Sequence, residues 1–189
     1  MRKVKLQLQT SLDGFIADRD GDMGWITWTQ DRDFIDCANS LIDTSDTIVM
    51  GRNLAEGFIP YWTDITTRPD DPQYHFAKKM IDTPKVVFSK TLQQSDWKNT
   101  MVAANELTIA INQLKNQEGK DIIVYGGSGL VSSLIKEGLI DEYCLFINPA
   151  ILGTGLPIYR LLEHTAKLKL IKAQPLNSGI VLLCYRSAE

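Results

Sequence analysis

The chain has few of the residues that build metal sites or disulfide frameworks. Among 189 residues it contains three cysteines, Cys37, Cys144 and Cys184, and two histidines. The cysteines are odd in number and widely spaced, and no C-x-x-C pair occurs. This pattern argues against a zinc site and against a disulfide framework. We therefore expect three buried or half-buried thiols and no bound metal.

Long apolar runs and an excess of positive charge are also missing. No apolar run approaches the roughly 20 residues that cross a bilayer. The net charge of −3 leaves no basic face for nucleic acid. Residues 1–6 alternate charged and apolar side chains, unlike the continuous apolar core of a signal peptide. We expect a cytoplasmic protein with neither a membrane nor a nucleic-acid partner.

The composition and length of the chain are typical of a soluble globular domain. Hydrophobic residues make up 44% of the chain and charged residues 23%, which is ordinary for a soluble protein. A chain of 189 residues is long enough to bury a substantial core. We expect residues 1–189 to form one domain.

Short apolar strands alternate with amphipathic helices along the chain. The patterns predict strands over residues 4–9, 47–50, 86–88, 122–125 and 143–147. They predict helices over residues 30–43, from a cap at Asn105 to near Gly119, and over 130–136. Residues 168–173 and 180–185 alternate around Asn177-Ser178-Gly179, as in an antiparallel hairpin, and the proline-rich residues 60–73 are the least regular. This order predicts an α/β domain with a mostly parallel sheet and an antiparallel edge.

The most informative segment is residues 122–131, where a buried strand runs into Gly126-Gly127-Ser128-Gly129 and then a helix. Glycines allow close approach of a ligand, and a helix start offers unpaired N–H groups and a positive dipole end. The segment is therefore either a phosphate cradle or a structural turn. It is not the usual dinucleotide fingerprint, because Ser132 stands where the third glycine should be.

Two further strand ends carry anion-binding chemistry. Gly51-Arg52 follows one buried strand, and Ser89-Lys90-Thr91 follows the next. An arginine can grip a phosphate through two parallel hydrogen bonds, although a surface salt bridge is the alternative for Arg52 alone. Because ligands of parallel sheets sit beyond the carboxyl ends of the strands, we expect the three turns to converge on one cleft. The cations would suit the 2′-phosphate that distinguishes NADPH from NADH.

These motifs carry a resemblance that spans nearly the whole chain. In order they are Ser11-Leu12-Asp13-Gly14-Phe15-Ile16-Ala17, Met50-Gly51-Arg52, Phe88-Ser89-Lys90-Thr91-Leu92, Tyr125-Gly126-Gly127-Ser128-Gly129, Gly138-Leu139-Ile140-Asp141-Glu142 and Pro149-Ala150-Ile151-Leu152-Gly153-Thr154-Gly155. The chain resembles the dihydrofolate reductase superfamily, in the branch of the riboflavin-pathway pyrimidine reductase domain. The resemblance implies a three-layer α/β/α sandwich with NADPH lying across a mostly parallel sheet that ends in an antiparallel hairpin.

The resemblance also implies roles for individual residues. Ile16 and Ala17 would flank the nicotinamide, although residues 11–17 could equally be a plain strand–loop junction. The remaining cofactor-binding residues would be Gly51, Arg52 and Asn53 at the adenosine phosphates, Ser89, Lys90 and Thr91 at the 2′-phosphate, and Gly126, Gly127, Ser128, Gly129 and Leu130 at the pyrophosphate. Where relatives read threonine and an aromatic residue, this chain has Leu54 and Ala55, which weakens the expected cofactor contacts.

On the substrate side, the resemblance suggests an acidic residue on the helix after the Asp-Gly loop. Asp33 is the candidate, for catalysis and for substrate binding, with Asp31 as a rival. Its alternative role is to stabilise the first helical turn through the dipole. Trp25 and Trp28 could wall a flat heterocycle or merely cover the core.

The leading hypothesis is an NADPH-dependent reductase resembling 5-amino-6-(5-phosphoribosylamino)uracil reductase of riboflavin biosynthesis. The nicotinamide would deliver hydride to a small heterocyclic substrate. The alternatives are a dihydropterin reductase and a non-catalytic nucleotide-binding module. Neither His-x-Glu nor Pro-Cys-x-x-Cys occurs, so a deaminase half is not expected. The resemblance also implies a homodimer, for which the apolar run 143–152 is a candidate interface.

Overall fold

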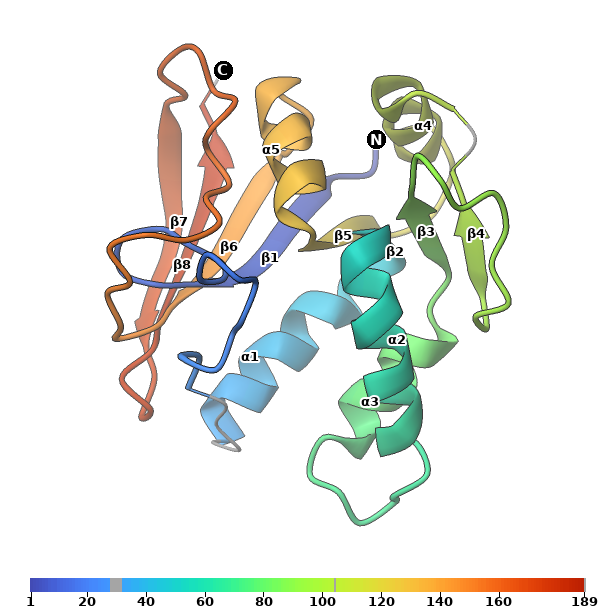
Figure 1. The fold of residues 1–189 in the computed structure, drawn as a ribbon, viewed down its shortest axis with the longest axis horizontal. Helices are drawn as coiled ribbons and strands as arrows, with labels where there is room; N and C mark the ends of the chain where they lie inside the picture. The colour runs from blue at the N-terminus through green and yellow to red at the C-terminus, as the bar shows by residue number, and fades with distance from the viewer. Residues whose placement is uncertain (28–31, 104, 189) are drawn as a thin grey trace.

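The computed structural model describes residues 1–27, 32–103 and 105–188. Within these ranges eight strands form one sheet, in the spatial order β4-β3-β2-β5-β1-β6-β8-β7 (Figure 1). The strands are β1 (Val4–Thr10), β2 (Ser45–Gly51), β3 (Lys85–Phe88), β4 (Thr100–Val102), β5 (Asp121–Gly126), β6 (Glu142–Ile147), β7 (Leu168–Pro175) and β8 (Val181–Ser187).

The first six strands in this spatial order run parallel to one another. β8 then pairs antiparallel with β6, and β7 antiparallel with β8. The mostly parallel sheet with a C-terminal antiparallel hairpin is therefore confirmed. Parallel neighbours bring their carboxyl ends to one edge of the sheet, and this edge positions the candidate site.

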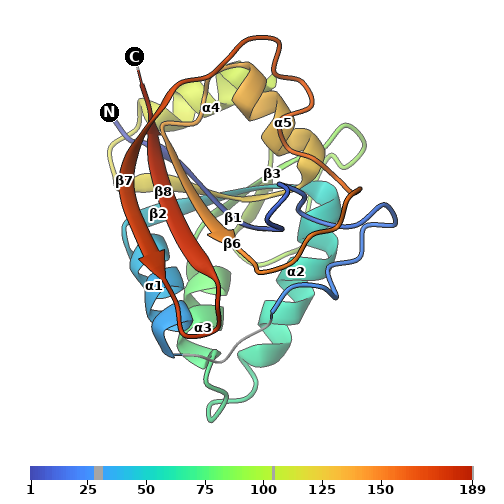
Figure 2. The ribbon, with the colours of Figure 1, turned by 90° about the vertical axis from the view of Figure 1, so that its left-hand side faces the viewer.

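Helices cover both faces of the sheet, which makes three layers (Figure 2). One face carries α1 (Arg32–Asp43), α2 (Arg52–Ile65) and α3 (Tyr74–Asp82), and the other carries α4 (Leu107–Lys115) and α5 (Ser128–Lys136). The alternation of β1 explains part of this division. Leu6 and Leu8 are buried in the cluster with α5 residues, whereas Lys5, Gln7 and Gln9 point to the face of α1 and α2.

The three cysteines lie in a separate cluster where α1 packs on β6 and β8. Cys37, Cys144 and Cys184 are all buried and free, as expected from their spacing. Cys144 and Cys184 stand directly opposite each other across the β6–β8 ladder. No helix among residues 1–27, 32–103 and 105–188 has both the length and the apolar character to cross a membrane.

Three expectations about local structure were wrong or incomplete. Residues 60–65 are helical, because α2 continues through Pro60 while Ile59, Trp62 and Ile65 are buried against the sheet side of the helix. The stabilisation from burying these side chains outweighs the cost of the backbone hydrogen bond that proline cannot make. Asn105 does not cap α4: Glu106 is the cap residue and makes no side-chain cap bond. The helices α2 and α3 and the three-residue edge strand β4 were not predicted.

Lys85, at the start of β3, ties that strand to the end of α3. Its side chain is almost fully buried, and its Nζ donates to the carbonyls of Met80, Ile81 and Thr83 at 3.0, 2.8 and 2.7 Å. The last carbonyls of a helix lack intrahelical partners, so the ammonium group satisfies two of them and also the carbonyl of Thr83, which follows the helix. Burial lowers the pKa of Lys85 to about 8, which still leaves it charged at neutral pH.

Replacing Lys85 with Met should lower the free energy of unfolding by about 1–3 kcal/mol, because buried carbonyls lose their donor. Lys98→Met is the matched control, since Lys98 is exposed and makes a surface ion pair with Asp82. We expect the control to change stability by less than about 0.5 kcal/mol in urea denaturation. Equal losses in the two variants would contradict the assigned role.

The lowered pKa of Lys85 predicts that the free energy of unfolding depends on pH. Its folded-state pKa of about 8 lies below its ordinary value of 10.5. Between these values the unfolded chain binds more protons, so native stability rises with pH relative to Lys85→Met. Denaturation of both proteins from pH 7 to pH 10 measures the difference, and a flat difference would count against it.

Candidate active site

Three strand ends meet at one edge of the sheet, as the sequence predicted. β3, β2 and β5 are consecutive neighbours, with Gly51 paired to Phe88 and Met50 paired to Gly126. The turns after β2 and β5 lie back to back, because a Cβ at Gly127 would stand 3.4 Å from the Gly51 Cα. The turn residues after three separate strands therefore share one edge.

The β5 turn needs glycine at both of its central positions. Gly126 and Gly127 have φ angles of +128° and +87°, which side chains rarely adopt. A Cβ at Gly126 would also stand 3.2 Å from the Leu8 side chain. These glycines consequently set both the sharpness of the turn and its close approach to β2.

Two helices begin at this shared edge. α2 starts at Arg52 after Gly51, and α5 starts at Ser128 after Gly127; neither cap residue makes a side-chain cap bond. The first N–H groups of each helix therefore point outward without a side-chain acceptor from the cap position. Two positive dipole ends side by side favour negative charge at this edge of the sheet.

Two arginines lie near these helix starts. Arg52 pairs with Glu56 one turn later at 2.7 Å, so the salt bridge that was its alternative role is present, although its side chain is 37% exposed. Arg160 approaches the other helix: its guanidinium lies 4.0 Å from the place a Cβ of Gly129 would occupy. Asn53 is exposed beside Arg52, and Ser128 and Leu130 are half-buried on the first turn of α5.

The third strand end is a hydroxyl-stabilised turn. Ser89 Oγ accepts the N–H groups of Thr91 and Leu92 at 3.1 and 2.8 Å. Lys90 and Thr91 are exposed. Ser89 thus shapes the turn, and its two neighbours face solvent at the end of β3.

The loop after β1 is bound to the loop after β6. Ile16 N–H donates to the Leu156 carbonyl at 3.1 Å, and Leu156 N–H donates to the Ala17 carbonyl at 2.9 Å. The Asp13 carboxylate accepts from Leu152 and Gly153 N–H at 3.2 and 2.7 Å. The Ser11 hydroxyl, donating at 2.7 Å, is the main cause that lowers the Asp13 pKa. Ile16 and Ala17 are therefore held in a cross-braced loop.

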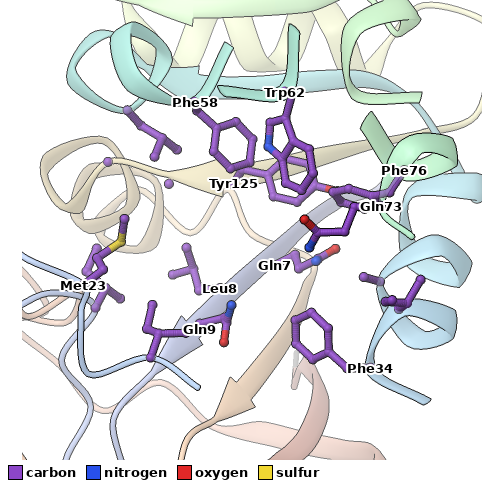
Figure 3. A pocket seen from close by; sticks show the side chains of 17 residues that line it. Gln7, Leu8, Gln9, Met23, Phe34, Phe58, Trp62, Gln73, Phe76 and Tyr125 are labelled. Atoms are coloured by element: carbon purple, nitrogen blue, oxygen red, sulfur yellow. The ribbon is translucent and has the colours of Figure 1, made fainter. Parts of the chain in front are cut away.

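A cavity of about 180 Å³ lies between the β1–α1 loop, α1, α2 and the sheet (Figure 3). Its lining residues are Gln7, Leu8, Gln9, Ile16, Met23, Ile26, Phe34, Ile35, Ala38, Leu54, Phe58, Trp62, Gln73, Phe76, Tyr125, Gly126 and Gly127. Ile16, Gly126 and Gly127 belong to the segments that the sequence analysis assigned to a cofactor. The cavity therefore adjoins the edge where α2 and α5 begin, through the β5 turn.

Aromatic side chains form one wall of the cavity. Phe58 lies 5.7 Å from Trp62 in an edge-on arrangement and 5.7 Å from Tyr125 at a tilt of 38°, centroid to centroid. Trp62 also meets Phe76 edge-on at 4.9 Å. Such pairs are each worth about 0.5–1.5 kcal/mol beyond their burial, so the wall is a rigid apolar surface.

Three buried polar atoms around the cavity have no hydrogen-bond partner among the described residues. They are Gln7 Oε1, Trp62 Nε1 and the Tyr125 hydroxyl. A buried polar group left unsatisfied costs about 1–3 kcal/mol, so native proteins contain few of them. Burial also raises the Tyr125 pKa, so this hydroxyl stays protonated. All three atoms are buried behind the cavity surface, in side chains whose other atoms line it.

Asn148 fixes the orientation of the side-chain amide of Gln9. Its Nδ2 donates to the Phe146 and Thr10 carbonyls at 3.2 and 3.4 Å, and its Oδ1 accepts from Thr27 N–H at 3.1 Å. The same Nδ2 donates to Gln9 Oε1 at 3.2 Å. Because backbone groups set the Asn148 amide, Gln9 must turn its oxygen toward it, which leaves the Gln9 amide nitrogen for the cavity side.

The predicted substrate residues lie outside this cavity. Asp33 is in the first turn of α1, where its carboxylate accepts the N–H groups of Phe34 and Asn177 at 2.9 and 2.7 Å. It therefore performs the dipole-stabilising role and also holds the β7–β8 turn. Trp25 is half-buried and does not line the cavity. Asp31 and Trp28 lie outside the described residues.

Sequence reasoning missed the aromatic wall, Arg160 and the role of Asn148. Arg160 comes from an irregular segment, and no pattern signals which helix start it approaches. Gln7 and Gln9 could have been noticed in the sequence, because polar side chains on one face of a central strand need hydrogen-bond partners on that face. Lys5 on the same face finds them in Asp121 and Thr44 at 2.7 and 2.9 Å, whereas the Gln7 oxygen does not.

Comparisons with known proteins agree with this arrangement. The family model of the RibD C-terminal domain matches residues 2–182. The "Uncharacterized protein YyaP" of Bacillus subtilis (strain 168) is 32% identical over 97% of this chain and 94% of its own length. The "Riboflavin biosynthesis protein RibD" of Corynebacterium ammoniagenes is 27% identical over 98% of this chain but only 51% of its own length. The chain thus spans about half of that protein.

Solved structures share the fold. A putative riboflavin biosynthesis protein from Shewanella sp. PV-4 has a TM-score of 0.73 at 24% identity, covering 99% of both chains. A diaminohydroxyphosphoribosylaminopyrimidine deaminase/5-amino-6-(5-phosphoribosylamino)uracil reductase from Thermotoga maritima has a TM-score of 0.69 at 18% identity, covering 99% of this chain and 57% of that chain. The layered α/β architecture inferred from the resemblance is therefore confirmed.

Two glycine substitutions should act in opposite directions. Gly127→Ala should lower the free energy of unfolding by about 1–2 kcal/mol, because alanine is strained at a φ of +87°. Gly57→Ala is the matched control: it lies inside α2 with nothing within 4 Å of its Cβ position. It should raise stability by about 0.5–1 kcal/mol. Thermal unfolding measures both, and a stabilised Gly127→Ala protein would rule out the tight turn.

Proposed function

We propose a reductase function for this chain, which belongs to the RibD C-terminal domain family. In this proposal NADPH binds along the carboxyl edge of the sheet, and a small heterocyclic substrate occupies the adjoining cavity. One observation carries the proposal: Gly126 and Gly127 line the cavity and also lead directly into the uncapped start of α5. A dinucleotide anchored at the helix starts would therefore reach the cavity.

The residues at the edge fit such a cofactor. The N–H groups at the starts of α2 and α5 suit a pyrophosphate, and glycines at 51 and 127 leave room for it. Arg160, Lys90 and the Arg52 side chain supply positive charge for the further phosphate of NADPH. When bound, the dihydronicotinamide would supply a hydride. Ile16 and Ala17, in their cross-braced loop, would limit where its ring can lie.

The cavity residues would bind, orient and exclude water. The aromatic wall and Leu54 keep the space apolar, which strengthens any polar contact made inside it. Gln9 and Gln73 are polar side chains of the lining that could orient a substrate by hydrogen bonds. Leu54, which stands where relatives have a hydroxyl side chain, contributes to this apolar lining.

The riboflavin-pathway names of the RibD relatives make 5-amino-6-(5-phosphoribosylamino)uracil the first substrate to test. The dihydropterin alternative needs a carboxylate beside the substrate. Asp33 does not line the cavity, because its carboxylate is bound to the N–H groups of Phe34 and Asn177. Among the described residues, the geometry therefore favours the pyrimidine over the pterin.

Calorimetric titration with NADPH tests the cofactor proposal. We expect binding, and Arg160→Ala should weaken it by about tenfold or more, because a charge-assisted hydrogen bond to phosphate is lost. Arg68→Ala is the control, since Arg68 forms exposed ion pairs with Asp64 and Asp71 beyond the end of α2. No binding of the unmodified protein at millimolar NADPH would remove the reductase proposal.

We also propose that the chain forms a homodimer through the exposed edge of β7. The run 143–152 cannot supply the whole interface, because its β6 part is an internal, buried strand. β7 instead ends the sheet and exposes Leu168, Leu170 and Ile171. An exposed apolar edge strand invites pairing with a second chain.

Leu170→Lys tests this interface, because a charge there would be buried against the second copy. Size-exclusion chromatography with light scattering should show a dimer of the unmodified chain and a monomer of the variant. Ile109→Lys, on the exposed surface of α4, should remain dimeric. A monomeric unmodified protein would refute the dimer.

A further inference from the structure

The geometry points to Gln9 as the residue that determines which ligands the cavity accepts, and to Asn148 as the residue that positions it. Gln9 presents an amide N–H donor, so the ligand must place an uncharged acceptor, such as a carbonyl oxygen, beside it. The inference rests on the proposed function only in that the cavity holds the substrate. It adds the polarity that this substrate must have at one point of the cavity.

Gln9 reaches the cavity from near the carboxyl end of the central strand β1. Its side chain is half-buried and belongs to the lining. Its Oε1 accepts from Asn148 Nδ2 at 3.2 Å, whereas no hydrogen bond among the described residues uses its Nε2. This nitrogen is not among the unpaired atoms buried behind the cavity surface, and in Figure 3 it lies on the side of the aromatic wall, with the oxygen on the opposite side. The end of the amide that faces the cavity is therefore a donor with two N–H groups.

Backbone groups fix the side chain of Asn148, which is fully buried. Its Nδ2 donates to the carbonyls of Phe146 and Thr10, and its Oδ1 accepts from Thr27 N–H. Reversing this amide would set its oxygen against two carbonyl oxygens and its nitrogen against an N–H group. Turning the Gln9 amide around would in turn set two NH₂ groups against each other. The direction of both amides is therefore fixed.

The other polar side chains of the lining do not offer a fixed group of this kind. Gln73 Oε1 is contacted at 3.4 Å by the hydroxyl of Tyr61, which is exposed. The unpaired atoms of Gln7, Trp62 and Tyr125 are buried. None of the described lining residues is charged, so an anion would lose its hydration without gaining a cation. An uncharged acceptor is therefore the group that the cavity selects.

Three small aromatic probes test the inference, titrated without NADPH into isotope-labelled protein and followed by two-dimensional NMR. Acetophenone carries a carbonyl acceptor, α-methylstyrene has the same shape with a CH₂ group in place of the oxygen, and indole carries an N–H donor. A cavity of about 150 Å³ in another protein binds benzene, so probes of this kind suit a cavity of about 180 Å³. We expect acetophenone to shift the side-chain amide signal of Gln9 downfield. An unmoved Gln9 signal, or no binding of any probe at millimolar concentration, would overturn the inference.

Gln9→Met removes the donor and keeps a side chain of similar length. It should weaken acetophenone binding by about tenfold, because the carbonyl oxygen is then buried without a donor. The affinity of α-methylstyrene, which has no acceptor, should stay within about threefold. Equal changes for the two probes would contradict the role of Gln9.

Gln9→Glu leaves an oxygen toward Asn148 and changes the atom that faces the cavity from a donor nitrogen to an acceptor oxygen. The ratio of indole affinity to acetophenone affinity should therefore rise by about tenfold or more. Gln117→Glu is the matched control, because Gln117 is exposed beyond the end of α4, and it should leave the ratio unchanged. A merely structural role of Gln9 would weaken both probes alike, and an unchanged ratio in Gln9→Glu would overturn the inference.

Asn148→Leu tests the positioning role, because it frees the Gln9 amide to turn either atom toward the cavity. The ratio of indole affinity to acetophenone affinity should rise several-fold, by less than in Gln9→Glu, in protein that still gives a folded NMR spectrum. An unchanged ratio would refute the role of Asn148. If this variant does not fold, the two Gln9 variants decide the inference.

A separate NADPH titration keeps this inference distinct from the proposed function. If NADPH binds and the Gln9 variants leave the probe preferences unchanged, the reductase proposal stands and the assignment of Gln9 is wrong. If the preferences change as expected and NADPH does not bind, the reductase proposal fails and the role of Gln9 stands.

Discussion

The close approach of two backbone turns, Gly51 against Gly127, is the contact on which the site depends. It brings the starts of α2 and α5 together at one sheet edge, so that two helix dipoles act on the same volume. The turn favours glycine, because Gly126 and Gly127 have positive φ angles that side chains rarely adopt. The sheet order β3-β2-β5 makes the contact possible by placing these strand ends side by side.

A second constraint is the polar face of the central strand β1. Most strands in the middle of a doubly covered sheet are apolar on both faces, whereas β1 directs Lys5, Gln7 and Gln9 toward α1 and α2. Lys5 and the Gln9 oxygen are satisfied by neighbouring side chains, but the Gln7 oxygen, Trp62 nitrogen and Tyr125 hydroxyl are not. Each unpaired buried polar atom of this kind lowers the stability of the folded protein.

Much of the fold could be predicted from the sequence, since strands and glycine turns have strong local signals. The convergence of Gly51-Arg52 with Gly126-Gly127 followed from the rule that parallel strands share a carboxyl edge. The cavity could not be predicted, because it depends on which side chains of α2 and α3 meet Tyr125, and neither helix was predicted; α2 contains Pro60. Asp33 was predicted to contact the substrate because of its position in the sequence. Its carboxylate instead accepts a hydrogen bond from the turn between β7 and β8.

Backbone amide chemical shifts measured during an NADPH titration test the central claim most directly, which is that the two helix starts act as one anion site. The account predicts that the amides of Arg52 and Asn53 and those of Ser128, Gly129 and Leu130 shift together with a single dissociation constant. Shifts at only one of the two helix starts, or at neither while NADPH binds elsewhere, would contradict it.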